Sequence, residues 1–309
     1  MAFTESALTY VTSGAEMYPA LSKMIIELTM PNLVVKQLLP EFPLPAGKSA
    51  TFVKENGSRA AAISQVGEGA EVPMDFTPYT TFTVIPYKKG LRERISRENI
   101  EDLYIPVIAN QMRRLARRMA FTIDKDCMTV IGNAAGTSNA ATSKSLSATG
   151  SEFTLSGVCG TKDILAAKAA VESYNFICDS FLLNPINARD VMYLPQFSLY
   201  AEYGEQPSGM EHGLVGMIYG MKVYVSNVVP AGTAYVLSTG PNLSASYAPL
   251  GYFVNITIIY GDGEVKRPLM TDVQVKQEFD SIDVSLTTRY APVVTCGEAI
   301  AAITSLNTS

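Results

Sequence analysis

The chain has little of what catalysis and metal binding need. Tryptophan is absent, and the one histidine, His212, stands in the glycine-flanked stretch SGMEHGLVG without a second histidine or a nucleophile motif beside it. A surface loop residue is therefore favoured over a general base or a metal ligand. The sequence has no phosphate-binding glycine loop, dinucleotide fingerprint or nucleophile elbow. We expect a protein that is not an enzyme and has no catalytic, cofactor-binding or metal site.

Cysteine is also scarce. The four cysteines are far apart in the sequence and form no C-x-x-C pair, so neither a zinc site nor a redox motif is indicated. We predict free, buried thiols at Cys127, Cys159, Cys178 and Cys296.

Charged residues make up only 17% of the 309 residues, whereas apolar residues reach 47%. An average soluble domain has roughly 25% charged residues, so much of this surface is expected to face protein rather than water. The apolar runs fall well short of the roughly 20 residues that a membrane-spanning helix needs, and the N-terminus lacks a signal pattern. We predict synthesis in the cytosol and no membrane partner.

Two segments near the N-terminus cannot bury their apolar residues alone. Residues 1–47 are interrupted by five prolines, which favours an extended arm over a long helix. Alternating apolar residues at 49–55 and 79–88 predict two paired strands, a ribbon that is marginal in isolation. Both segments are expected to lie on another surface. The arm residues that need cover are Met24, Ile25, Leu28, Leu33, Val34, Leu38 and Leu39.

A long, one-sided helix is predicted over residues 106–131. Pro106 suits the first helical position, apolar residues recur at spacings of three and four, and Gly132 is a natural stop. The small, polar residues 133–157 predict a loop. Beyond it, the sequence predicts an amphipathic helix in TKDILAAKAAVESY, a buried strand, a short helix that begins near Ala188, and a series of further strands.

In this order the elements resemble the major capsid protein of tailed viruses of bacteria and archaea, the HK97-like group. The likeness rests on IPVIANQMRRLARRMAFTIDKDCMTVIG for a spine helix, SFLLNPINARDVMYLPQ and GMKVYVSNVVPAGTAYVLS for an axial domain, and VSLTTRYAPVVTCGEAIAAITS for the last peripheral strands. It covers nearly the whole chain. It implies an α+β fold, the HK97-like capsid fold, with an N-terminal arm, an extended β-hairpin loop, a long spine helix, and peripheral and axial domains.

The resemblance implies the following boundaries: the arm at 1–47, the extended loop at 48–92, the peripheral domain at 93–150 with its spine helix at 106–131, the axial domain at 151–263, and a return to the peripheral domain at 264–309. The implied function is that of a structural subunit. Pentamers and hexamers would form an icosahedral virion shell around double-stranded DNA, assembled in the host cytoplasm. Because Met1 stands almost directly before the arm, a separate scaffolding protein is expected, together with portal and decoration proteins.

Alternatives to a viral shell stay open at this point. An encapsulin-type nanocompartment shares the fold but encloses cargo enzymes and no genome. An enzyme that uses His212 or a cysteine is disfavoured, because the arm and the ribbon need a partner surface. A covalent cross-link from Lys54 is not expected, since the only asparagine between Glu264 and the end of the chain is Asn307 in the tail.

Four arginines crowd into the stretch RRLARR of a chain with net charge −5, namely Arg113, Arg114, Arg117 and Arg118. Their spacing places them on the side of the helix opposite its apolar residues. Two interpretations are open. The resemblance implies an inner wall on which some of them face packaged DNA, and the alternative is pairing with carboxylates such as those of Glu101 and Asp102.

A second charged run, RERISRE, occupies residues 92–98, where the ribbon meets the helix. It either pairs with acids of a neighbouring subunit's ribbon, Glu55 among them, or forms a solvated hinge. The residues assigned to such intersubunit ion pairs are Lys54, Glu68, Glu71, Arg92, Arg94 and Arg97.

Overall fold

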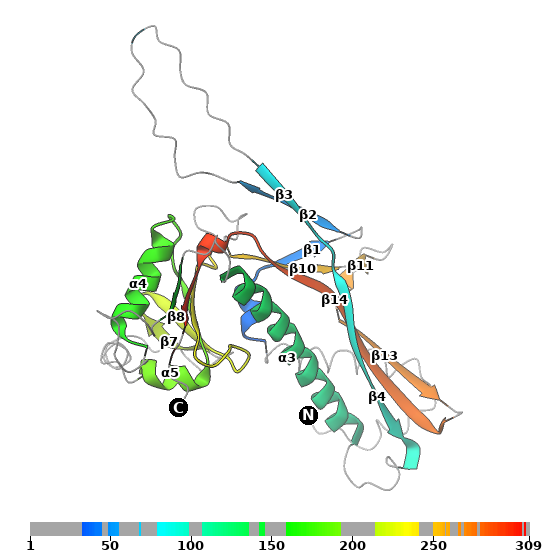
Figure 1. Cartoon of the computed structure of the whole chain (residues 1–309). Helices are drawn as coiled ribbons and strands as arrows, with labels where there is room; N and C mark the ends of the chain where they lie inside the picture. The colour runs from blue at the N-terminus through cyan, green and yellow to red at the C-terminus, as the bar shows by residue number, and fades with distance from the viewer. Residues whose placement is uncertain are drawn as a thin grey trace.

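The computed structural model describes most of the predicted elements. The described residues are 33–44, 49–55, 68, 79–98, 107–135, 142–145, 159–192, 214–240, 250–256, 258–259, 265–266, 269–276, 279–304 and 306. They form two parts and a projecting ribbon (Figure 1). We call the part around the long helix the peripheral part and the part around the second sheet the axial part, after the predicted domains. The ribbon projects from the peripheral part.

The peripheral sheet is organised around the fourteen-residue strand β14 (Ser281–Val294). Its second half pairs antiparallel with β10 (Gly251–Ile256), which pairs parallel with β1 (Glu41–Leu44). Its first half lies between β13 (Leu269–Lys276) and β4 (Tyr87–Ser96), both antiparallel to it. One strand therefore joins two groups of partners. A short pair, β11 (Ile258–Ile259) and β12 (Val265–Lys266), stands apart from this sheet.

The axial sheet has six strands in the order β5-β15-β9-β6-β8-β7. Its helices are α4 (Thr161–Glu172) and α5 (Pro185–Met192), and the short 3-10 turn η7 (Gly297–Ala299) leads into its strand β15. Every residue of β6 is buried, as expected of a strand covered on both faces. The strands are β5 (Thr142–Ser145), β15 (Ile300–Thr304), β9 (Ala234–Leu237), β6 (Ser180–Leu183), β8 (Met221–Val225) and β7 (Leu214–Ile218).

The spine helix α3 (Val107–Ala135) continues past the predicted stop at Gly132. Ile131 and Ala135 are buried, and an added Cβ on Gly132 would lie 3.6 Å from the hydroxyl of Tyr235. Tertiary packing thus favours one further turn over termination at the glycine. The loop predicted over 133–157 was also wrong in part, because it contains β5, which pairs parallel with β15.

Helix α5 begins at Pro185 rather than near Ala188. Asn184 determines this start, because its Oδ1 accepts the backbone N–H of Ile186 at 3.0 Å while its Nδ2 donates to the carbonyl of Val229 at 2.7 Å. A proline in the first turn loses no hydrogen bond there, so the Asn-Pro pair is a better helix start than the apolar periodicity that follows it.

The predicted ribbon is confirmed as the antiparallel pair β2 (Ala50–Glu55) and β3 (Tyr79–Val84). In Figure 1 it projects from the peripheral part, and its root lies beside β1 and β10. The predicted second strand, 79–88, is interrupted by Ile85 and Pro86, after which β4 joins the peripheral sheet. Proline has no N–H to donate to a ladder, which explains the break.

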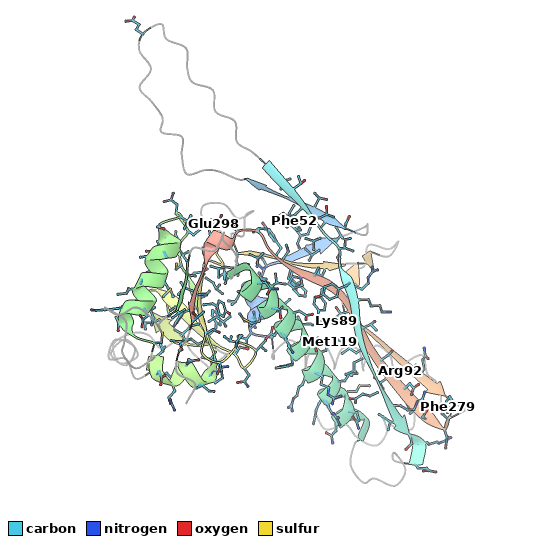
Figure 2. All side chains as sticks on the ribbon, viewed as in Figure 1. Phe52, Lys89, Arg92, Met119, Phe279 and Glu298 are labelled. Atoms are coloured by element: carbon cyan, nitrogen blue, oxygen red, sulfur yellow. The ribbon has the colours of Figure 1, made fainter. Side chains whose placement is uncertain are left out.

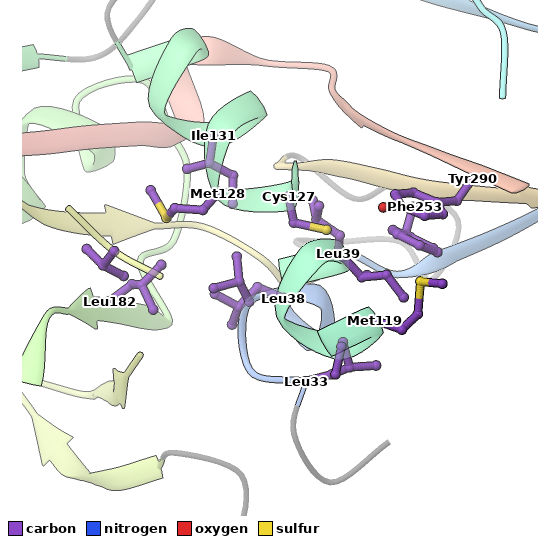
Figure 3. Close-up of a cluster of buried hydrophobic side chains, with 14 of the residues drawn as sticks. Leu33, Leu38, Leu39, Met119, Cys127, Met128, Ile131, Leu182, Phe253 and Tyr290 are labelled. Carbon is purple, nitrogen blue, oxygen red and sulfur yellow. The ribbon is translucent and has the colours of Figure 1, made fainter. Parts of the chain in front are cut away.

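Part of the predicted arm belongs to the subunit's own core. Leu33, Leu38 and Leu39 are buried against the inward face of α3, together with Met119 and Phe253 (Figure 3). The expectation that these leucines need another surface was wrong. The 3-10 turn η4 (Val35–Leu38) presents them to the helix, and residues 1–32 lie outside the described part.

Candidate functional site

The outward face of the spine helix carries the four arginines, as predicted. Arg113, Arg114, Arg117 and Arg118 are all exposed. Met112, Leu115 and Met119, on the opposite face, are buried in the core. The described residues separate the arginines into two pairs with different surroundings.

Arg114 and Arg118 converge on the carboxylate of Glu93, a residue of β4. The Arg118 Nη1 lies 3.1 Å from Glu93 Oε1, and the Arg114 Nε lies 3.9 Å from the same atom. Glu93 is 15% exposed, and its other oxygen, Oε2, is buried without a hydrogen-bond partner in the described part. The predicted partners Glu101 and Asp102 lie outside the described residues. Strand alternation could have identified Glu93, because it shares the helix-facing side of β4 with the buried Ile95.

Arg113 and Arg117 form no ion pair within the described part of the chain. Four residues further along are Phe121, which is 53% exposed, and then Lys125, which is also exposed. Residues four apart on a helix stand on one side of it. We call this row, Arg113, Arg117, Phe121 and Lys125, the outer strip. It presents three cations and one aromatic ring, and no carboxylate interrupts the row.

The arginines of the second charged run form ion pairs within the same chain. Arg94 binds the carboxylate of Asp283 through two nitrogens, at 2.8 and 3.1 Å, and Arg92 binds the same carboxylate. Asp283 is 2% exposed, and the hydrogen bonds from Arg94 and then Arg92 lower its pKa. Arg97 lies 3.5 Å from Asp280, and the Arg94 guanidinium lies 4.7 Å from the ring centre of Phe279.

The same run lies on a basic face of the sheet. Alternation along β4 places Lys88, Arg92 and Arg94 on the side away from α3, and Arg289 of β14 stands directly opposite Lys88. Lys88 and Arg289 are exposed and form no ion pair within the described residues. We call these four residues the basic face. Like charges opposite each other destabilise a sheet. An acidic partner on this face would therefore offset the repulsion between Lys88 and Arg289.

The predicted ribbon residues for intersubunit pairs are described only in part. Glu68 is exposed. The side chain of Lys54 and the whole of Glu71 lie outside what the structure describes, so no distance links them to the basic face.

The helix-facing side of β4 is fixed by Asp126 of α3. Its carboxylate accepts hydrogen bonds from Lys89 Nζ at 2.6 Å, from Tyr290 Oη at 2.6 Å and from Tyr87 Oη at 3.2 Å. Burial and the Asp126 charge raise the pKa of Tyr87 to about 12. Burial and the hydrogen bond to Asp126 also raise the pKa of Tyr290. These hydrogen bonds fix the position of the spine helix relative to β4 and β14. Asp126 stands within the stretch that predicts the spine helix, but the periodicity of that stretch does not indicate this role.

The described residues contain no group of three His, Cys, Asp or Glu side chains that could hold a metal ion. His212 lies outside them. The prediction of free, buried thiols is confirmed for all four cysteines. Burial raises the pKa of Cys159 and Cys178 to about 12 each. Among the described residues, no helix is long and apolar enough to cross a membrane.

Known structures share this fold. The capsid structure of the cyanophage P-SCSP1u has a TM-score of 0.62 at 14% identity, with 87% of each chain covered. A structure from Mycobacterium phage Bobi has a TM-score of 0.63 at 13% identity, covering 90% of this chain and 91% of that one. The holo-SrpI encapsulin complex from Synechococcus elongatus PCC 7942 reaches 0.57 at 14% identity, covering 88% and 87%. The predicted HK97-like α+β capsid fold is therefore confirmed.

The family match favours the viral relatives over the nanocompartment. No curated protein matches the chain. Residues 79–305, well over half of the chain, match the family model described as phage capsid protein. The chain therefore belongs to the phage capsid protein family, as a structural component of a viral capsid and not an enzyme.

Proposed function

We propose that the chain is the shell subunit of a tailed virus and assembles as pentamers and hexamers into an icosahedral shell around double-stranded DNA. The observation that carries the proposal is the projecting ribbon. Val53 on β2 is 61% exposed and Ile85 at the end of β3 is 66% exposed. A two-stranded ribbon is marginal alone, and exposed apolar side chains on it favour contact with a neighbouring subunit.

Charge complementarity supports a specific seat for the neighbour's ribbon. The ribbon segment 55–75 contains Glu55, Glu68, Glu71 and Asp75 against the single base Arg59. The basic face offers Lys88 and Arg289, which have no partner within the described residues, beside the partly compensated Arg92 and Arg94. We assign the ribbon of a neighbouring subunit to this face, so that many weak contacts add across a closed lattice.

The outer strip supports contact with DNA. Arginine and lysine bind phosphate without reading sequence, and neutralising each phosphate releases counterions, so binding weakens with salt. Arg113, Arg117 and Lys125 are available for this role, whereas Arg114 and Arg118 are engaged by Glu93. We therefore assign nucleic-acid contact to the first group and alignment of the helix with β4 to the second.

The further partners follow from the shell proposal. They are a separate scaffolding protein, a portal and decoration proteins, with no membrane. The second candidate is a nanocompartment shell that encloses cargo enzymes, favoured by the likeness to the encapsulin complex. It differs in what it encloses, so the contents of the particle decide between the two.

Electron microscopy of the purified protein, expressed alone, tests the proposal. Closed shells, rings of five or six, or tubes are expected, and the absorbance ratio at 260 and 280 nm reports nucleic acid inside them. Small uniform shells filled with protein would instead support the nanocompartment. A stable monomer that forms no assembly at any salt concentration would overturn both.

Duplex DNA binding by the unassembled subunit tests the two arginine pairs. Arg113→Ala with Arg117→Ala is expected to lower the slope of log affinity against log salt by about 2, since each phosphate contact contributes roughly 0.9. Arg114→Ala with Arg118→Ala is the matched control, with the same change of charge, and is expected to leave the slope nearly unchanged. Equal effects of the two double variants would overturn the assignment.

A further inference from the structure

Four aromatic rings meet where the ribbon leaves the body. Phe52 of β2 stacks on Phe82 of β3 at 5.7 Å between ring centres and on Tyr252 of β10 at 5.6 Å. Phe42 of β1 contacts Phe52 edge-on at 5.3 Å and Tyr252 at 5.9 Å. We call these four residues the aromatic seat. Figure 2 shows Phe52 at this junction, near the foot of the ribbon.

The seat covers a small hydrophobic core of its own. Leu44, Ala50, Val254 and Val293 are buried beneath it and form a cluster separate from the two larger cores. The ribbon contributes Ala50 and the two phenylalanines, and the body contributes the rest. Within the described residues the two ribbon strands pair only with each other, so packing against β1 and β10 holds the root of the ribbon.

Strand β1 is the least firmly held strand beside the aromatic seat. Among the described strands it lies at the edge of the sheet, has four residues and pairs only with β10, and Phe42 is 38% exposed. Additional contacts hold it in place. The Phe253 N–H donates to the carbonyl of Pro40 at 2.8 Å, Asn255 Nδ2 donates to Glu41 Oε2 at 3.1 Å, and Lys36 pairs with the other oxygen of Glu41. The position of Phe42 therefore depends on the chain that precedes it.

That preceding chain is fixed to the spine helix by one buried carboxylate. Asp124 is 2% exposed, and its oxygens accept the backbone N–H groups of Val34 at 2.8 Å, Val35 at 3.3 Å and Lys36 at 3.0 Å. Three successive amides on one carboxylate fix the turn that presents Leu38 and Leu39 to the core. We call residues 33–44 the arm anchor.

We infer that the arm anchor controls whether the root of the ribbon is seated. A continuous series of contacts runs from Asp124 through Lys36 and Glu41 to Phe42, and from Phe42 to Phe52. Release of the anchor removes β1, and with it one wall of the aromatic seat. The inference concerns the single subunit and does not depend on the shell.

Amide hydrogen exchange of the unassembled subunit, read by mass spectrometry, tests the coupling. Asp124→Asn replaces one acceptor oxygen by a donor and leaves at least one anchor amide unpaired. Peptides covering 33–44 are expected to exchange about tenfold faster, and peptides covering 50–55 and 79–84 are expected to follow them. Phe42→Ala is expected to accelerate the two ribbon peptides alone. Unchanged exchange in β6 and β9 shows that the fold is intact.

Two further variants serve as a control on the ribbon and as a second way to weaken the arm anchor. Thr81→Ala removes a side chain from the exposed face of β3, directly before Phe82, and is expected to leave ribbon exchange unchanged. Glu41→Gln weakens the link to Lys36 without touching the buried Asp124, and is expected to accelerate the ribbon about threefold if the aspartate variant fails to fold. Faster exchange confined to the anchor, with the ribbon unchanged, would overturn the coupling.

Discussion

The Nζ atom of Lys89 and the Oδ2 atom of Asp126 lie 2.6 Å apart and join strand β4 to the spine helix. The same carboxylate accepts the hydroxyl of Tyr290, which is fully buried, and that of Tyr87. Figure 2 places Lys89 between the spine helix and the sheet, below the ribbon. A charged lysine with two tyrosines satisfies the carboxylate better than any one of them could, so the helix and the sheet have a defined relative position.

Asp126→Ala is expected to destabilise the subunit by about 2 to 3 kcal/mol. The change leaves the buried Tyr290 hydroxyl and the partly buried Lys89 ammonium without their shared acceptor, and an unpaired buried polar group costs its desolvation free energy. Urea unfolding of the unassembled subunit measures the loss. Lys125→Ala, an exposed change at the residue directly before Asp126, is the control and is expected to stay within about 0.5 kcal/mol. Equal midpoints for both variants would contradict the role given to Asp126.

Alkaline pH should reduce the contribution of Tyr290 to the stability of the folded subunit. In an unfolded chain tyrosine ionises near pH 10, whereas burial and Asp126 raise the pKa of Tyr290 in the folded chain. Above about pH 10 only the unfolded state loses this proton, so the stability that Tyr290 supplies is complete below that pH and declines above it. The stability difference between the natural chain and Tyr290→Phe is therefore expected to shrink between about pH 8 and about pH 11. A constant difference in urea midpoints would refute this.

Acidic pH should remove the stability that Asp283 supplies, as alkaline pH removes that of Tyr290. Hydrogen bonds from Arg94 and Arg92 lower its pKa, so the folded state holds the charged form at a pH where the unfolded chain already binds a proton. The resulting stability is present above about pH 4 and is lost as the pH falls through the lowered pKa. Asp283→Asn is expected to flatten the decline in thermal stability on acidification. Asp280→Asn, at an aspartate that is 67% exposed, is the matched control and should keep the slope.

The long elements could be predicted from the sequence because their periodicity records burial. The spacing of Met112, Leu115 and Met119 defines one face of the spine helix, and the alternation about Phe52 and Phe82 defines the ribbon. The ends could not be predicted as well. A side chain at Gly132 would meet the hydroxyl of Tyr235, and Asn184 donates to the carbonyl of Val229. Both of these neighbours are distant in the sequence.

The candidate surfaces were predicted less completely, because charge pairs form between elements. The run RRLARR indicated exposure, but only the register of β4 brings Glu93 to Arg114 and Arg118. The arm was misjudged for a related reason. Apolar residues between prolines indicate that the segment must be buried against something, but not against which surface. The arm anchor is fixed to the subunit's own helix by Asp124, which lies 88 positions after Lys36 in the sequence.

Two glycines of the peripheral sheet are expected to differ sharply in their tolerance of alanine. At Gly251, where φ is +146°, an added Cβ would lie 2.0 Å from the carbonyl oxygen of Val293, which the sheet holds in place. At Gly90 the nearest atom, at 2.7 Å, is the Cγ2 methyl of Thr287. Gly251→Ala is therefore expected to prevent soluble expression, whereas Gly90→Ala should cost about 1 to 3 kcal/mol.

The steric origin of the smaller effect can be isolated by a second change. Thr287→Ser removes the methyl group that an added Cβ on Gly90 would meet, and keeps the hydroxyl. The double variant Gly90→Ala with Thr287→Ser is expected to recover at least half of the loss, because the next contact, at 3.1 Å, is the carbonyl of Leu286. Urea unfolding of the two single variants and the double variant gives the coupling free energy. Additive losses would show that the cost arises elsewhere, from the backbone of β4 rather than from the contact between the two strands.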